Sequence, residues 1–471
     1  MKRLFLLLIL ISAPLSAGKE SPMAKEIKRM KFEPLNWSIP TVGKEIEKVE
    51  LPSGTVLYLK ENHNLPLIEI SIFIKGGIAY LAPGDKLIPD LLLSSMLKGG
   101  TKSFEPDELI DSIEINAIKI DSRVEDEYLR LTYSFQPQFL ELAIKLIDEM
   151  IFYPAFNPEK VEEEKAKVEN YWTRYIDDAE NLLSEVSKSV LFTENPISSK
   201  PNLEKFRKVT REDLVKVHKM FFQPKNMVIS VVGYFNSLEM KSYLTDVFDA
   251  YKNNDYALSI MTPKPLIERK VYFVQKEVPQ GYVYIVQDAP CGYSRDLVTL
   301  LLVGDILGGG FNSKIVSKVR NELGLAYNTY AYFSVLSNIK GVFYAFTATR
   351  SDALHDAIYY MEEAIKQMIN GNITKDELEL SKESFLSSTV TSINNDWTYL
   401  QRLALRNLFG FPDDYLLKLR DEVAKQNMET IKQISAKYLQ PEKMAILVVG
   451  DSTKINMKKL EEFGPIQIIE Y

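Results

Sequence analysis

The sequence predicts an α+β protein of two homologous domains, each with a mixed or antiparallel sheet and helices packed on one face, in a clamshell arrangement. The chain has 471 residues, enough for two domains of roughly 200 residues each. Residues 221–233 and 438–450 share seven of thirteen positions, with a helical pattern before each. Strands and helices do not alternate strictly, which favours antiparallel or mixed sheets. The chain therefore reads as a duplicated unit.

The N-terminus has the pattern of a secretory signal. Basic residues 2–3 precede an apolar run at 4–11 and small residues at 12–18. We expect a signal peptide over residues 1–18, an extension over 19–40, and an exported protein, periplasmic if the source is a Gram-negative bacterium. The alternative is a buried N-terminal helix. No later uncharged run approaches the ~18 residues of a membrane span, so we expect no transmembrane segment.

Local patterns place the elements of the first domain, which we assign to residues 41–250. A hairpin with its turn at Pro52 to Gly54 opens the domain, and a strand at 221–233 closes it. Between them we predict strands at 67–75, 118–123 and 127–135, and helices at 88–97, 107–114, 138–152 and from 158 to about 175, with further helical segments up to 217.

The second domain, assigned to residues 269–471, follows a linker at 251–268. Residues 297–310 align with residues 87–100, so that the two first halves also correspond. Within this domain, residues 308–333 run from a glycine loop into a short helix ending near Arg320, turn at Gly324, and continue as a strand through Tyr327. We expect the two polar side chains to meet at one edge.

Several classes of chemistry are disfavoured. The formal charge of −7, without a long basic block, argues against nucleic acid as a partner. Cys291, the one cysteine, lies in a predicted loop and gives no disulfide or thiolate cluster. The three histidines never form a His-x-x-x-His or His-x-x-Glu-His pair, so surface or structural roles are expected for them. No phosphate-binding loop or Gly-x-Ser-x-Gly elbow occurs.

Three segments carry a family resemblance. They are Met-Leu-Lys-Gly-Gly-Thr at 96–101, the two Gln-Pro-x-x-Met endings, and the Arg-x-x-x-Gly-Leu-x-Tyr stretch at 320–327. In these the chain resembles the insulinase, pitrilysin and mitochondrial processing peptidase family of zinc peptidases. The resemblance covers nearly all of the mature chain. It implies a His-x-x-Glu-His motif just before the first segment, with a distant Glu as the third zinc ligand.

The zinc motif is missing from its implied place. The two histidine positions are occupied by Leu91 and Ser95, and the glutamate position by Ser94. The third ligand would fall near Asn170 or Tyr171, next to a Glu that we expect to face elsewhere. A leucine and two serines cannot hold zinc with useful affinity or activate a water molecule, so we expect no metal in this chain and no proteolysis by it alone.

Some members of the family divide the work between two chains. One carries the zinc motif, and its partner lacks it but keeps an Arg and a Tyr that reach the substrate. Arg320 and Tyr327 match that pair, and Gly308, Gly309 and Gly310 resemble the glycine loop that some partners use to handle substrate. Each has a structural alternative. Arg320 could be a cation favoured at a helix C-terminus, Tyr327 an ordinary strand aromatic, and the three glycines a tight turn between helices.

Two functions follow from the resemblance. In the first, the chain is the zinc-free subunit of an exported heterodimeric metallopeptidase. Zinc would then be held by a homologous partner with His-x-x-Glu-His, and a peptide would be the substrate. In the second, it is a non-catalytic structural or peptide-binding protein of the same fold. The retained Arg320 and Tyr327 favour the first, because a guanidinium and a phenol can donate to a peptide carbonyl as charge develops on it.

Overall fold

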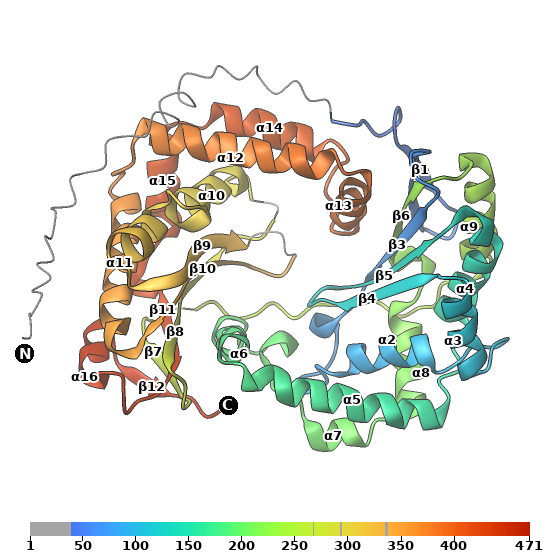
Figure 1. Ribbon diagram of the computed structural model, residues 1–471, viewed down its shortest axis with the longest axis horizontal. Helices are drawn as coiled ribbons and strands as arrows, with labels where there is room; N and C mark the ends of the chain where they lie inside the picture. The colour runs from blue at the N-terminus through green and yellow to red at the C-terminus, as the bar shows by residue number, and fades with distance from the viewer. Residues whose placement is uncertain (1–38, 267, 293, 335–337) are drawn as a thin grey trace, which may run out of the picture. The chain divides into compact units, whose positions relative to one another are not determined.

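The computed structural model describes residues 39–266, 268–292, 294–334 and 338–471, and residues 39–471 form one compact unit (Figure 1). The predicted signal peptide, and all but the end of the predicted extension, lie outside the described residues. In the part that is described, no helix is both long enough and apolar enough to cross a membrane.

The first half of the chain builds a six-stranded mixed sheet. Its spatial order is β1-β2-β6-β3-β5-β4. Neighbouring strands are antiparallel except for the pair β2 and β6, which is parallel. The strands are β1 (Glu47–Glu50), β2 (Val56–Glu61), β3 (Ile68–Lys75), β4 (Lys119–Val124), β5 (Tyr128–Phe135) and β6 (Met227–Gly233).

The second half builds another six-stranded sheet, with the order β12-β7-β11-β8-β10-β9. Here β11 is parallel to β7 and antiparallel to β8, and β8, β10 and β9 follow as antiparallel neighbours. The strands are β7 (Val271–Gln275), β8 (Gln280–Ala289), β9 (Ala326–Ser334), β10 (Gly341–Arg350), β11 (Ala445–Gly450) and β12 (Ile466–Ile468).

The two sheets share one topology. Strands β2, β6, β3, β5 and β4 correspond in order and direction to β7, β11, β8, β10 and β9. The repeated Gln-Pro-x-x-Met segments lead into β6 and β11, which hold the same place in the two sheets. The predicted duplication of one α+β unit is therefore confirmed. The outermost strands differ, because β1 is antiparallel to β2 whereas β12 is parallel to β7.

Helices connect the strands in both halves. Those of the first half are α2 (Ile88–Lys98), α3 (Pro106–Ile115), α4 (Leu140–Phe152), α5 (Pro158–Asp177), α6 (Ala179–Leu191), α7 (Leu203–Arg207), α8 (Arg211–Phe221) and α9 (Ser237–Ala250). Those of the second half are α10 (Leu297–Gly304), α11 (Leu354–Ile369), α12 (Lys375–Ile393), α13 (Asp396–Leu408), α14 (Tyr415–Lys425), α15 (Met428–Tyr438) and α16 (Met457–Leu460). Residues 251–266, between α9 and β7, contain no helix or strand.

Local sequence explains where these elements start and which face they bury. Helix α3 begins at Pro106, behind a capping box formed by Glu105 and Glu108. Strand β3 alternates, so that Ile70 and Ile72 enter the hydrophobic core with the helices of the first half. Ser71, between them, points to the opposite face, where its hydroxyl lies 3.0 Å from that of Thr132 on β5.

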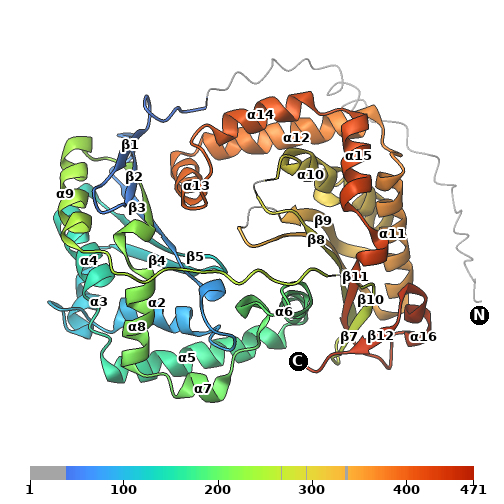
Figure 2. The ribbon, with the colours of Figure 1, turned by 180° about the vertical axis from the view of Figure 1, so that it is seen from behind.

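A helix from the other half of the chain contacts each sheet. Helix α13 packs on β2, β3 and β6 of the first sheet, and α6 packs on β8 and β11 of the second (Figures 1 and 2). Gln401 on α13 donates hydrogen bonds to Glu69 (2.8 Å) and to the Ser71 hydroxyl (3.0 Å), on the polar side of β3. The sequence did not predict this exchange of helices between the halves.

Ion pairs fix α13 and the turn that follows it. Asp396, the first residue of α13, binds the Lys60 ammonium and accepts a 2.8 Å hydrogen bond from Asn62. Asp413 accepts a 2.5 Å hydrogen bond from the Tyr58 hydroxyl. These contacts join residues more than 300 positions apart, so the two halves hold each other in register through β2.

Candidate functional site

The Arg320 and Tyr327 side chains lie together at the edge of the second sheet. Arg320 belongs to the π-helical segment Val316–Glu322, and Tyr327 is the second residue of the edge strand β9. Gly324 makes the turn between them with a φ of +60°, in the left-handed region that favours glycine. The guanidinium carbon of Arg320 lies 4.5 Å from the centre of the Tyr327 ring.

A second ring completes this group. The Arg320 guanidinium carbon is 4.6 Å from the centre of the Phe311 ring, so two aromatic rings hold the cation. Tyr327 is 82% exposed and Phe311 63% exposed. Among the described residues, no carboxylate pairs with Arg320. The guanidinium and the phenol are thus held in place, and both can donate to a molecule outside the fold.

The glycines before this helix have different surroundings. A Cβ on Gly308 would come within 2.0 Å of the Ala331 backbone nitrogen, so this glycine lets the chain pack closely on β9. A Cβ on Gly309 would meet the Asp305 carboxylate at 2.3 Å, whereas one on Gly310 would meet nothing within 4 Å. Packing therefore accounts for Gly308 and Gly309, and Gly310 is open to solvent.

The implied zinc positions fall on α2. Leu91 and Ser95 are fully buried, and the Ser94 hydroxyl donates a 3.2 Å hydrogen bond to the Leu91 carbonyl within the helix. Glu169 on α5 receives hydrogen bonds from Arg207 on both carboxylate oxygens, from Nη2 on Oε1 and from Nε on Oε2, and it does not line the cavity beside α2. Across the described ranges, no group of three or more His, Cys, Asp or Glu side chains is placed to hold a metal ion.

A cavity of about 590 Å³ lies beside α2 and α5. Ser94 and Tyr171, which occupy implied zinc-site positions on the two helices, both line it. Two ammonium groups, from Lys86 and Lys188, line the same cavity. Asp90, Glu164 and Glu185 also line the cavity, but Glu164 and Glu185 are paired with lysines. These side chains do not form a zinc-binding group within the described residues.

Lys86 is held in a buried ion pair. Its ammonium binds the Glu185 carboxylate on α6, and the two side chains are 4% and 3% exposed. Burial lowers the pKa of Lys86, against the opposing pull of Glu185. The ammonium also lies 5.5 Å from the centre of the Trp172 ring, on α5. This pair joins the start of α2 to α6, and sequence reasoning missed it because 99 positions separate the two residues.

Comparisons with known proteins agree with this fold. Residues 88–222 match the family model described as insulinase (peptidase family M16), and residues 208–385 match the one described as peptidase M16 inactive domain. "Non-peptidase homolog YmxG" of Helicobacter pylori is 22% identical over 423 residues, which cover 87% of this chain and 94% of that protein. "Uncharacterized zinc protease YmxG" of Bacillus subtilis is 22% identical over 415 residues, 86% and 98% of the two chains.

A solved structure shows the same architecture. The peptidase M16 inactive domain from Pseudomonas fluorescens superposes with a TM-score of 0.78 at 18% identity, over 86% of this chain and 98% of that one. Together with the matched models, this places two M16-type units in one chain. The protein belongs to the insulinase family, peptidase family M16.

Proposed function

We propose that this protein is a non-catalytic M16 subunit that cleaves no peptide alone. The proposal rests on two features, one in each half of the chain. The first half has Leu91, Ser94 and Ser95 at the implied zinc positions, and the second presents Arg320 against Tyr327 on an exposed edge. A relative that covers most of the chain is named a non-peptidase homologue, which is consistent with this role.

The finer proposal is a heterodimer. A homologous partner with His-x-x-Glu-His would hold the zinc ion, and the peptide would be enclosed between the two chains. Arg320 and Tyr327 would donate hydrogen bonds to the carbonyl under attack, and Gly310, the open glycine of the loop, would be free to contact the peptide. Export, to the periplasm in a Gram-negative source, belongs to the same proposal and rests on the pattern of residues 1–18.

Both side chains suit this chemistry. The two rings that hold the Arg320 guanidinium orient it, so little reorganisation is needed when a peptide carbonyl gains negative charge. Removal of one such donor typically costs about 2.7–4 kcal/mol of barrier, which is roughly 10²–10³ in kcat.

Mixing experiments test the heterodimer. The purified chain is expected to contain no stoichiometric zinc and to cleave no peptide, and activity should appear on addition of an M16 partner that carries His-x-x-Glu-His. In that mixture, Arg320→Ala should lower kcat about 10²- to 10³-fold. Arg350→Ala is the matched control, because Arg350 is an exposed arginine of the same half that pairs with Asp352.

Two results would contradict the proposal. Full turnover by the Arg320→Ala complex would remove the donor role. Stoichiometric zinc in the isolated chain would contradict the inference that Leu91, Ser94 and Ser95 leave this chain without a zinc site. The second candidate, a structural or peptide-binding protein of this fold, is favoured by the name of the Helicobacter relative. It predicts a stable assembly, or peptide binding, without peptidase activity on mixing with any partner.

A further inference from the structure

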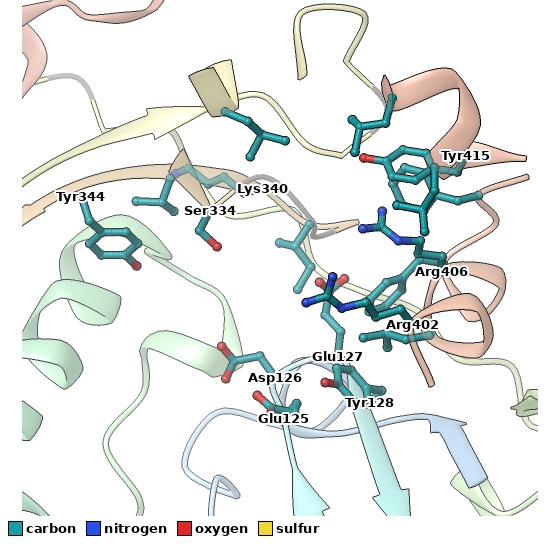
Figure 3. A pocket seen from close by; sticks show the side chains of 18 of the residues that line it. Glu125, Asp126, Glu127, Tyr128, Ser334, Lys340, Tyr344, Arg402, Arg406 and Tyr415 are labelled. Carbon is teal, nitrogen blue, oxygen red and sulfur yellow. The ribbon is translucent and has the colours of Figure 1, made fainter. Parts of the chain in front are cut away.

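A second cavity, of about 590 Å³, is lined by two arginines that form no ion pair with a carboxylate among the described residues. Residues from both halves line it: the β4–β5 turn at Glu125 to Tyr128, and helices α6, α12, α13 and α14. Figure 3 shows the Arg402 and Arg406 side chains extending from α13 into this space. We call it the arginine pocket. Its volume lies within the range typical of ligand sites, about 300–1,000 Å³.

Arg402 and Arg406 are one helical turn apart, so their guanidinium groups share one face of α13. Like charges at this spacing destabilise a helix unless an anion lies between them. Across the part of the chain that the structure describes, neither arginine forms an ion pair with Asp or Glu. Partial burial, and then the charge of Arg406, lower the pKa of Arg402, although much of the Arg402 side chain remains exposed to solvent.

Arg406 of α13 and Tyr415 of α14 meet in the wall of the pocket. Burial raises the pKa of Tyr415, and the charge of Arg406 and its interaction with the hydroxyl oppose this rise. The Arg406 guanidinium carbon lies 4.0 Å from the centre of the Tyr415 ring, and this stacking fixes its orientation. A guanidinium has five N–H donors, so the remaining N–H groups of Arg406 can donate to a ligand that accepts hydrogen bonds.

Three acidic residues, Glu125, Asp126 and Glu127, line the opposite wall of the pocket. The Glu127 carboxylate accepts a 3.0 Å hydrogen bond from the Asn338 backbone nitrogen, and Asp126 pairs with Lys188 at 3.4 Å. Burial raises the pKa of Glu125. Among the described residues, none of the three forms an ion pair with Arg402 or Arg406, so the two guanidinium groups can bind an anion from outside the chain.

The remaining wall is largely apolar. Phe385 on α12, Phe409 after α13, and Leu416 and Leu419 on α14 surround the arginines. A small hydrated anion would leave this surface exposed to water. A carboxylate attached to an apolar side chain would satisfy both parts of the pocket, because a guanidinium binds a carboxylate through two parallel hydrogen bonds.

We propose that the arginine pocket binds a peptide carboxylate between Arg402 and Arg406, with the Tyr415 hydroxyl as a further donor and an adjacent apolar side chain on Phe385 and Phe409. The carboxylate is either the C-terminus of the peptide or an Asp or Glu side chain. This inference deepens the proposed function, on which it rests for the choice of a peptide as ligand. The binding itself requires no partner chain.

Binding of acetylated alanine hexapeptides that end in phenylalanine tests the pocket. The purified chain is titrated by calorimetry with the free acid, with its C-terminal amide, and with amides that carry Glu or Gln at the fifth position. A terminal site predicts that the free acid binds about 10- to 100-fold more tightly than its amide, the range expected for hydrogen bonds to a charged group. A side-chain site predicts the same preference for Glu over Gln.

Variants assign the binding to the two arginines. Arg402→Gln and Arg406→Gln should each reduce the carboxylate preference at least tenfold, whereas Arg350→Gln should leave it unchanged. Thermal unfolding of each variant establishes that it is folded. A Tyr415→Phe variant, which keeps the ring stacked on Arg406, should weaken the carboxylate preference by a smaller factor.

The pocket and the heterodimer can fail separately. Equal binding of the acid and amide forms, or an unchanged preference in folded Arg402→Gln and Arg406→Gln, would refute the pocket without affecting zinc-dependent cleavage on mixing. Conversely, carboxylate-dependent binding by the isolated chain would stand even if no partner gave peptidase activity.

Discussion

His218 should make the stability of this protein depend on pH below neutrality. It lies on α8, almost fully buried, and is stacked on Phe222 with ring centres 4.7 Å apart. Its Nε2 lies 2.8 Å from the Ile151 carbonyl oxygen. Since a carbonyl can only accept, Nε2 carries the hydrogen and the neutral ring is satisfied. Burial lowers the pKa of His218 from 6.5 to about 4, although the bond to Ile151 opposes this.

The sign and size of the effect follow from the two pKa values. Between pH 6.5 and about 4, the unfolded chain binds a proton that the folded chain excludes, so stability is present above pH 6.5 and is lost as the pH falls through 4. At 1.36 kcal/mol for each pKa unit, the full loss is about 3 kcal/mol. Between pH 7.5 and 4.5 it amounts to about 2.5 kcal/mol.

Urea unfolding at pH 7.5 and 4.5 measures this loss. Carboxylates also titrate in this range, so the wild type is compared with His218→Gln, whose amide can donate to the same carbonyl. The fall in the free energy of unfolding between the two pH values should be about 2.5 kcal/mol smaller in the variant. His63→Gln is the control, because His63 is a histidine whose side chain is 52% exposed. Parallel pH dependence in wild type and His218→Gln would refute the argument.

Two further substitutions test packing and the buried ion pair. Gly308→Ala should destabilise the fold by about 1–3 kcal/mol in urea unfolding, because its Cβ would overlap the Ala331 backbone. Gly310→Ala is the control and should not change the free energy of unfolding. Equal effects of the two substitutions would contradict the packing role of Gly308. Lys86→Met should cost about 3 kcal/mol by leaving Glu185 buried with a more distant lysine, and Lys86→Met/Glu185→Leu should recover most of that loss. An additive double variant would show that the pair is not coupled.

Much of the fold follows from short-range patterns. The predicted turn at Pro52 to Gly54 lies between β1 and β2, and the predicted strands at 118–123 and 127–135 correspond to β4 and β5. The helix predicted from 138 begins at Leu140, after a 3-10 turn that its proline favours. The predicted helix near Arg320 is π-helical instead of α-helical, a difference of hydrogen-bond register that side-chain periodicity does not resolve.

In the candidate site, too, contacts between residues close in the sequence could be predicted, and contacts between distant residues could not. Arg320 and Tyr327 are seven positions apart across one glycine turn, so the sequence could predict that they meet. The Lys86–Glu185 pair and the placing of Arg402 opposite the β4–β5 turn join distant segments. An Arg-x-x-x-Arg spacing on a helix was visible in the sequence as a signal. It does not show whether a carboxylate from elsewhere in the chain faces the two arginines.

The sequence by itself determined the duplicated α+β unit, the loss of the zinc motif at Leu91, Ser94 and Ser95, and the local pairing of Arg320 with Tyr327, because each depends on residue identity or near-neighbour spacing. The tertiary structure alone decided that α13 and α6 cross between the halves, that Lys86 is paired with Glu185, and that Arg402 and Arg406 form no ion pair with a carboxylate of the described residues. These features depend on which distant side chains meet after folding, and no local pattern encodes such contacts.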